Sequence, residues 1–256
     1  LKNENIEDPV TVADLKVNDL IIRRITEKYR NINWEILSEE NVKITSITYK
    51  TNADWVWVLD PLDGTRDFMQ GTGNYAMHLA LNYRCKPFLG IVLIPEKEEL
   101  WIAFRDNVWC EKKDGSLINP NLSNNGILGN MVLVTSKNHS NQTLNKLIQK
   151  INFKKTIIMG SIGCKIASII RGDSDIYISL SMPGMSSPKD WDFAAPDAIL
   201  KAAGGLITNL DNQELSYGKL NFEQGGIIVA TNDAKTHQKI CLSIKEIIDK
   251  YQIYPS

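Results

Sequence analysis

The first half of the chain shows a helical pattern of apolar residues followed by a series of short apolar runs. Residues 8–14 predict an extended approach to a helix, and from Ala13 apolar residues recur at roughly helical spacing as far as Ile25. Runs of β-branched and aromatic residues bounded by turn residues then predict strands. These strands are expected at residues 35–37, 55–59, 76–83, 88–94, 99–104 and 108–110. Strands that follow one another so closely favour a mainly antiparallel sheet.

The second half alternates between strand and helix patterns. Residues 119–130 are rich in Asn, Ser, Gly and Pro, which predicts a loop, and we place a domain boundary there, giving domains 1–130 and 131–256. Beyond the boundary, strands are expected at residues 131–135, 155–159, 176–180 and 227–230, and helices at 141–151, 165–171, 193–203 and 234–251. Such alternation is typical of an α/β unit.

Composition narrows the class of protein. The 256 residues carry 29 Lys and Arg against 30 Asp and Glu, and this balance argues against binding to a nucleic acid polymer. Four scattered cysteines without a C-x-x-C pair disfavour a zinc module or a disulfide framework and fit a reducing cytoplasm. No apolar run reaches the roughly 18 residues of a membrane span, and no signal peptide pattern opens the sequence. We therefore expect a cytoplasmic protein that does not bind membranes.

The residues after the second predicted strand carry the clearest chemistry. Asp60 and Asp63 lie three residues apart across Pro61, whose φ is fixed, and Gly64 permits a tight turn. Two carboxylates that converge in this way supply the oxygen ligands that Mg²⁺ prefers. The backbone N–H groups of Gly64 and Thr65 would face an anion, especially if a helix begins there. The alternative is an ordinary turn, because Asp, Pro and Gly are common turn residues.

Three further acidic residues are candidates for the same site. Glu39 follows a predicted strand, Asp192 precedes a predicted helix, and Asp14 lies near the start of the first helix. The alternative for Glu39 is a solvated loop residue, and for Asp14 and Asp192 it is helix capping. H-E-x-x-H and the P-loop pattern are absent, and an EF-hand would need a ligand at Leu62. Residues 71–76 imitate a dinucleotide-binding pattern but precede a strand instead of opening a helix.

Taken together, five short motifs resemble the lithium-sensitive, magnesium-dependent phosphatase superfamily. This group contains the inositol monophosphatases, the 3'(2'),5'-bisphosphate nucleotidases and the fructose-1,6-bisphosphatases. The motifs are V-T-V-A-D at 10–14, S-E-E at 38–40, D-P-L-D-G-T at 60–65, W-D-x-A-A at 191–195 and A-G-G at 203–205. The resemblance implies a layered α-β-α-β-α sandwich, an α+β and α/β fold with a mixed N-terminal sheet and an α/β C-terminal half.

The resemblance also implies the cofactor, two to three Mg²⁺ ions, and its ligands. Glu39, Asp60 and the carbonyl oxygen of Leu62 resemble the ligands of the first ion. Asp60, Asp63 and Asp192 resemble those of the second, and a third, weaker ion in the family also uses the position of Glu39. Bound metal ions lower the pKa of water and shield the attacking and leaving oxygens of a displacement.

Catalytic and substrate-binding roles follow from the same resemblance. Thr65 and Asp14 resemble the pair that deprotonates the attacking water. Lys165 falls where the family builds its substrate pocket and could pair with a second phosphate, although a solvated lysine on a helix surface is the alternative. The residues expected to bind substrate are Gly64, Thr65, Ser161, Gly163 and Lys165.

Three features favour the nucleotidase branch of the superfamily. Asp67 stands before Phe68, Ser38 replaces a common glycine, and residues 189–196 resemble the Lys-x-Trp-Asp-x-x-Ala-Pro pattern of the nucleotidases. The resemblance therefore implies hydrolysis of the 3'-phosphate of 3'-phosphoadenosine 5'-phosphate, a by-product of sulfate assimilation. The alternatives are an inositol or sugar phosphatase with the same metal site, or a noncatalytic metal- or nucleotide-binding regulator. A regulator should have lost a metal ligand, and all of them are present.

Two expectations concern the rest of the molecule. Members of the family have a helix before the region of Asp8, and the seven residues that precede Asp8 here do not supply it. Because the sequence begins with Leu1, we expect part of the native core to be missing. The expected partner is a small phosphate ester. The family is often dimeric, which leaves a homodimer open.

Overall fold

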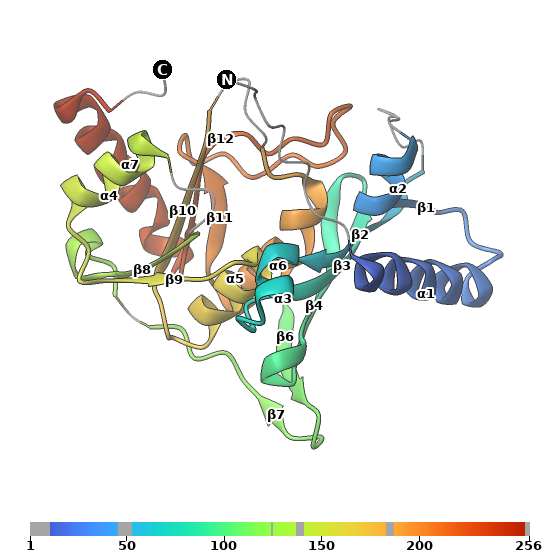
Figure 1. Cartoon of the computed structure of the whole chain (residues 1–256). Coiled ribbons are helices and arrows are strands. Elements are labelled where there is room, and N and C mark those ends of the chain that lie inside the picture. Colours follow the sequence, from blue (N-terminus) through green and yellow to red (C-terminus); the bar gives the residue numbers. More distant parts are fainter. Residues whose placement is uncertain (1–10, 46–52, 124, 137–140, 183–186, 254–256) are drawn as a thin grey trace.

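The chain folds into two β-sheets with helices between them and on their outer faces (Figure 1). The computed structural model describes residues 11–45, 53–123, 125–136, 141–182 and 187–253. The extended segment predicted at residues 8–10 lies outside this part. No helix in the described ranges combines the length and the apolar character that crossing a membrane requires.

The first sheet has seven strands that follow the order of the chain. The first pair, β1 and β2, runs parallel, and the remaining neighbours are antiparallel, which confirms the mainly antiparallel sheet that was predicted. The strands are β1 (Glu35–Ser38), β2 (Trp55–Asp63), β3 (Ala76–Tyr83), β4 (Lys86–Ile94), β5 (Glu99–Phe104), β6 (Asn107–Lys112) and β7 (Leu117–Ile118).

The second sheet has five strands in the order β11, β12, β10, β8, β9. The neighbours β10, β8 and β9 run parallel, whereas β12 is antiparallel to β10 and β11. The strands are β8 (Val132–Thr135), β9 (Lys155–Ile158), β10 (Ile176–Ser181), β11 (Leu206–Asn209) and β12 (Gly226–Thr231). The sequence pattern missed β11, because it comes directly after a helix-ending glycine pair.

Helices occupy three layers around the sheets. On the outer face of the first sheet lies α1 (Val12–Lys28), and on the outer face of the second lie α4 (Gln142–Ile151) and α7 (Ala234–Tyr251). Between the sheets lie α5 (Ile162–Ile170) and α6 (Asp190–Ala203) (Figure 1). The result is the predicted α-β-α-β-α sandwich. The two short helices α2 (Glu39–Thr45) and α3 (Thr65–Gln70) follow β1 and β2.

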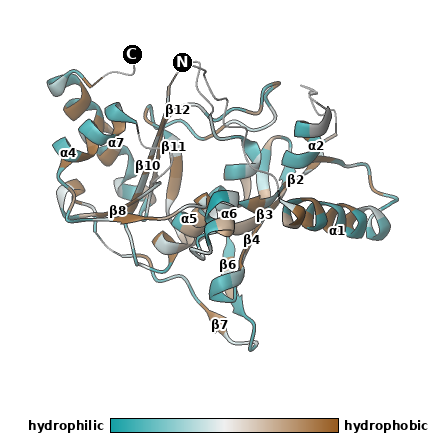
Figure 2. Cartoon of the chain, viewed as in Figure 1, coloured by the Kyte–Doolittle hydropathy of each residue, from teal (hydrophilic) through white to brown (hydrophobic). Residues whose placement is uncertain are grey.

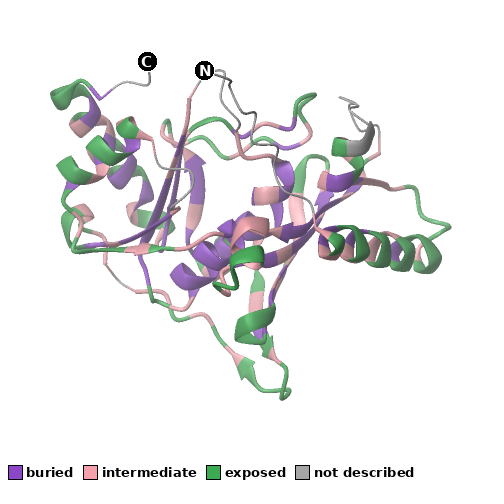
Figure 3. Ribbon diagram, in the orientation of Figure 1, coloured by how far each residue is buried: buried purple, intermediate pink, exposed green. Residues whose placement is uncertain are grey.

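Burial follows from this layering. All nine residues of α5 are buried (Figure 3), as expected for a helix that is largely apolar on every side and lies between two sheets. By contrast α4 and α7 show polar outer faces and apolar inner faces (Figure 2), whereas α1 leaves Val12, Leu15 and Leu20 exposed. The division into domains 1–130 and 131–256 stays a prediction, although the change of sheet between β7 and β8 falls near that boundary.

Two helices begin three residues earlier than the sequence pattern predicted. The first, α5, begins at Ile162, because the hydroxyl of Ser161 accepts a hydrogen bond from the backbone N–H of Cys164 and caps the helix. The second, α6, begins at Asp190, and the side chain of Asp192 closes its first turn. The earlier starts matter because both helix N-termini point into the candidate site.

The contact between β4 and α6 predicts the effect of a small substitution. A Cβ atom at Gly90 would lie 2.6 Å from Cβ of Ala198 and 2.7 Å from the carbonyl oxygen of Ala195. Gly90→Ala should therefore lower the free energy of unfolding by about 1–3 kcal/mol through overpacking. The matched control is Gly129→Ala, where the added Cβ has nothing within 4 Å. Urea denaturation of both variants measures the difference, and equal effects would show that α6 does not press on β4 at this point.

Candidate active site

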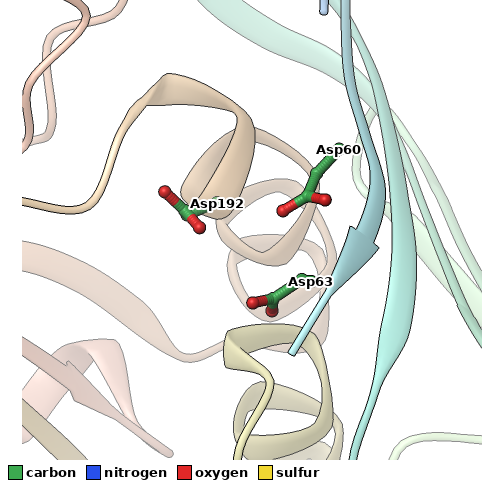
Figure 4. A group of neighbouring side chains, drawn as sticks. All are labelled: Asp60, Asp63 and Asp192. Atoms are coloured by element: carbon green, nitrogen blue, oxygen red, sulfur yellow. The ribbon is translucent and has the colours of Figure 1, made fainter. Parts of the chain in front are cut away.

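Three carboxylates from distant parts of the chain meet between the two sheets. Asp60 and Asp63 lie at the end of β2, and Asp192 lies in the first turn of α6 (Figure 4). Each offers one ligand oxygen, and these oxygens all lie within 4.8 Å of one another. The structure therefore brings together the three residues that the sequence assigned to the second metal ion.

Local backbone geometry sets the positions of Asp60 and Asp63. Residues 60–63 belong to β2, which is longer than the predicted 55–59, but the register with β3 shifts between Asp60 and Asp63. The N–H of Leu62 donates to Oδ1 of Asp60 at 3.0 Å. Gly64 then adopts φ +89°, and a Cβ there would lie 2.9 Å from the carbonyl oxygen of Asn74, so only glycine fits. The irregular strand end explains how two carboxylates three residues apart face the same side.

The N-terminus of α5 holds the side chain of Asp63. Its Oδ2 accepts hydrogen bonds from the hydroxyl of Ser161 at 2.6 Å, from N–H of Ile162 at 2.5 Å and from N–H of Gly163 at 3.3 Å. A helix N-terminus stabilises negative charge through its free N–H groups and its dipole. Ser161 and Gly163, expected to bind substrate, are thus seen to hold Asp63, and their contact with substrate stays a prediction.

The first turn of α6 holds Asp192. Its Oδ2 accepts a hydrogen bond of 2.6 Å from the backbone N–H of Lys189, the residue before the helix. Helix capping was the alternative interpretation of Asp192, and the structure shows that capping and membership of the cluster go together. The same side chain caps α6 through Oδ2 and also supplies a ligand oxygen to the cluster.

The cluster concentrates negative charge in a buried place. Burial, followed by the charges of Glu39, Asp63 and Asp192, raises the pKa of Asp60 well above its usual range. Burial, followed by the charges of Asp63 and Glu39, raises the pKa of Asp192 in the same way. A cation between these groups would relieve both effects, and a set of carboxylate oxygens suits a hard divalent ion. The residues present therefore fit the metal site that the sequence predicted.

Glu39 lies at the edge of this cluster. It opens α2, and its Oε1 forms an ion pair of 2.8 Å with Nζ of Lys43. It contributes no oxygen to the group of three, yet its charge raises the pKa of Asp60 and of Asp192. The solvated-loop alternative is wrong, since Glu39 lies in a helix and burial raises its own pKa. Nothing in the sequence indicates that Lys43 pairs with a residue of the site, because a lysine four residues after a glutamate is typical of an ordinary helix surface.

A hydroxyl and a second carboxylate lie beside the cluster. Oγ1 of Thr65 lies 3.2 Å from Oδ1 of Asp14 and 3.1 Å from the carbonyl oxygen of Leu62. The single hydroxyl proton can be donated to only one of these acceptors at a time. Asp14 also accepts from the N–H of Thr11 at 2.8 Å in the capping box of α1. The structure therefore joins the predicted catalytic pair, and α1 fixes the orientation of Asp14.

Lys165 is buried inside the molecule. Only 1% of it is exposed, which rules out the solvated helix-surface alternative. Its Nζ donates to the carbonyl oxygen of Gly160 at 2.6 Å and lies 5.3 Å from the ring centre of Tyr177. Burial lowers its pKa to about 8, although the nearby carboxylates, Asp63 first among them, act in the opposite direction. A buried cation next to an acidic cluster is well placed to balance further negative charge.

Sequence comparison shows the family of the protein. Residues 1–249 match the model of the inositol monophosphatase family. A 3'(2'),5'-bisphosphate nucleotidase CysQ of Buchnera aphidicola is 32% identical over 211 residues, covering 82% of this chain and 74% of the relative. The CysQ nucleotidase of Salmonella typhimurium is 26% identical and covers 82% and 80%. The chain therefore belongs to the inositol monophosphatase family, and it is a hydrolase of the phosphatase class.

Solved structures agree on the fold. A calcium-bound inositol monophosphatase family protein from Staphylococcus aureus superimposes with a TM-score of 0.74 at 20% identity, covering 96% of this chain and 84% of that one. An inositol monophosphatase from Thermotoga maritima gives a TM-score of 0.72 at 22% identity and covers 97% and 88%. These likenesses support the layered architecture described above.

The charge of the cluster predicts how divalent ions and pH act on stability. Because their pKa values are raised in the folded state, Asp60 and Asp192 stabilise the metal-free protein most below their unfolded-state pKa of about 4. This contribution is lost as pH rises from there to their raised folded-state pKa values. Mg²⁺ at about 100 times its Kd should add about 2.7 kcal/mol, a rise in Tm of several degrees that is larger at about pH 8 than at about pH 5.5.

Thermal unfolding with Mg²⁺ or with a chelator measures this effect. Asp192→Asn should abolish most of the Mg²⁺-dependent rise while raising the Tm of the metal-free protein at about pH 8, because one repelling charge is gone. The control is Asp106→Asn, which changes an exposed carboxylate in the turn between β5 and β6. An undiminished Mg²⁺ effect in Asp192→Asn would remove Asp192 from the metal site.

Proposed function

We propose that the protein is a Mg²⁺-dependent phosphomonoesterase that removes the 3'-phosphate of 3'-phosphoadenosine 5'-phosphate in the cytoplasm. The observation that carries the proposal is the meeting of three carboxylates, of which Asp60 is buried, with a hydrogen-bonded pair of Thr65 and Asp14 beside them. The preferred substrate is supported by relatives that bear the name 3'(2'),5'-bisphosphate nucleotidase. The four cysteines are free, which agrees with a reducing compartment.

Five residues would hold two to three Mg²⁺ ions. Asp60, Asp63 and Asp192 supply the oxygens already gathered, and Glu39 and the carbonyl oxygen of Leu62 complete the set. When bound, the ions supply a nucleophile of lowered pKa and neutralise charge on the phosphate. The N–H groups at the N-terminus of α5 hold the carboxylate of Asp63 in place.

The pair of Thr65 and Asp14 would accept the proton of the attacking water. As the water oxygen forms its bond to phosphorus, a proton passes to Oγ1 of Thr65, and the hydroxyl proton of Thr65 passes to Oδ1 of Asp14. The bond from phosphorus to the ester oxygen breaks, and the leaving oxygen takes up a proton from solvent. Asp14 suits this task because the capping box of α1 orients it.

The substrate anion would lie against backbone and lysine donors. The N–H groups of Gly64 and Thr65 open α3 at the end of β2, next to the cluster. Lys165 lies close enough to Asp63 and Asp192 for their charges to act on its pKa, and it would balance the second phosphate of a bisphosphate. Charge neutralisation is the main requirement of phosphoryl transfer.

The metal ligands give a direct test of catalysis. Asp63→Asn should lower kcat by more than about 100-fold, because even outer partners of a metal site contribute 10–100-fold. The fold should persist, since the asparagine oxygen can still accept from the N–H groups of α5. Phosphate release and circular dichroism measure the two effects, with Asp106→Asn as control. Near-normal turnover in Asp63→Asn would exclude the proposed role of this carboxylate.

The buried lysine gives a test of substrate class. The wild-type protein should show a higher kcat/KM on 3'-phosphoadenosine 5'-phosphate than on inositol 1-phosphate or fructose 1,6-bisphosphate. Lys165→Met keeps the volume and removes the charge, so it should raise KM for the nucleotide bisphosphate about tenfold and KM for the inositol monophosphate less. A tenfold change corresponds to about 1.4 kcal/mol, which is within reach of one charged contact.

The control for this test is Lys113→Met, which removes an exposed lysine at the turn after β6. Equal increases of KM on both substrates would assign Lys165 to packing or to general charge. A preference of the wild-type protein for inositol 1-phosphate would overturn the proposed substrate and leave the phosphatase class standing.

A further inference from the structure

His78 lies in the middle of β3, where it pairs with Asp60 of β2, and the chemistry above does not use it. The side chain is fully buried. Its Nε2 lies 3.3 Å from Oδ2 of Asp63, and its Nδ1 lies 3.4 Å from the carbonyl oxygen of Trp191. No described residue forms a hydrogen bond of regular geometry with Nε2. A buried polar atom without a hydrogen bond of regular geometry requires an explanation, because leaving it unpaired lowers the stability of the folded protein.

The two neighbours of the imidazole decide where its proton lies. A carbonyl oxygen and a carboxylate can only accept hydrogen bonds, and a neutral imidazole carries one N–H. The carboxylate is a charged acceptor, and such hydrogen bonds are roughly twice as strong as neutral ones. The proton therefore belongs on Nε2, facing Asp63. Hydrogen bonds at active sites are often long or poorly aligned before the ligands bind, which accounts for the present geometry.

The surroundings are shaped to admit the imidazole. A Cβ atom at position 163 would lie 2.2 Å from Nε2 of His78, so the glycine at the start of α5 leaves room for the ring. Oδ2 of Asp63 is then approached from two directions, by the first turn of α5 and by His78. Because all of these contacts fall on Oδ2, Oδ1 is the oxygen that would bind the cation.

We propose that His78 is a positioning residue that donates its Nε2–H to Oδ2 of Asp63 and so directs this carboxylate toward the bound cation. The inference rests on the proposed metal site. Partners of this kind orient metal ligands and strengthen their binding, and their loss typically weakens metal affinity 10–100-fold. His78 touches neither substrate nor cation, and it acts through Asp63 alone.

Two matched variants separate the two nitrogen atoms of the ring. His78→Gln can place an amide N–H near the position of Nε2, whereas His78→Asn can place one only near Nδ1, facing Trp191. Isothermal titration with Mn²⁺ alone should give a Kd for His78→Gln within about threefold of wild type and a Kd for His78→Asn raised 10–100-fold. Thermal unfolding in chelator shows whether either variant has lost stability for other reasons.

A measurement on the unaltered protein keeps the test decisive if the variants fail to fold. The chain has three histidines, so the imidazole resonances of ¹⁵N-histidine-labelled protein are few. His78 should show a protonated Nε2 and an unprotonated Nδ1. For this measurement the diamagnetic Mg²⁺ is used instead of Mn²⁺, and the Nε2 resonance should move as Mg²⁺ is titrated.

Each outcome has one meaning. A proton on Nδ1, or equal Mn²⁺ affinities for His78→Gln and His78→Asn, would overturn the role of His78 and leave the metal site intact. A wild-type protein that binds neither Mn²⁺ nor Mg²⁺ would instead overturn the proposed function. A protonated Nε2 together with recovery of affinity in His78→Gln supports the inference.

Discussion

Three carboxylates whose ligand oxygens lie within 4.8 Å of one another, in a partly buried place, are the constraint on which this structure depends. Each carboxylate is fixed by a backbone N–H group: Asp60 by Leu62, Asp63 by the first turn of α5, and Asp192 by Lys189. These hydrogen bonds hold the side chains in place but do not cancel their repulsion. The fold therefore contains an unfavourable interaction that a bound divalent cation would relieve, and binding of such an ion would stabilise the folded state.

The layered arrangement of sheets and helices brings the residues of this cluster together. The end of β2 and the N-termini of α5 and α6 converge between the sheets, so strand and helix ends deliver polar groups while the layers around them stay apolar. Close approach is essential: Gly90 lets α6 lie against β4, and Gly163 lets α5 lie against His78. Gly90 thus sets the distance between the sheet that carries two carboxylates and the helix that carries the third, and Gly163 sets the distance between that sheet and the helix that holds Asp63.

The sequence predicted the local elements and the acidic residues better than their environment. Strands with β-branched runs are predicted because that signal is local. The sequence pattern missed β11, which comes directly after a helix-ending glycine pair, and α2, whose opening by two glutamates gives no clear period. The sequence does not decide whether Lys165 binds substrate or lies on a solvated helix surface, since only the packing of α5 between two sheets shows that it is buried. His78 had no signal in the sequence, because its meaning depends on Asp63, which the chain brings near only by folding.

The hydrogen bonds that hold Asp63 also set an order of events during synthesis. Its partners on α5 lie 98 to 100 residues further along the chain, and α6 follows later still. If the first sheet forms before α5 and α6 leave the ribosome, its inner face has no cover, and apolar residues such as Val58 and Ala80 are exposed to water. Contacts of such long range form slowly, and uncovered strands invite aggregation. The nascent chain is therefore most vulnerable between completion of the first sheet and emergence of α6, the interval in which a chaperone would be of greatest use.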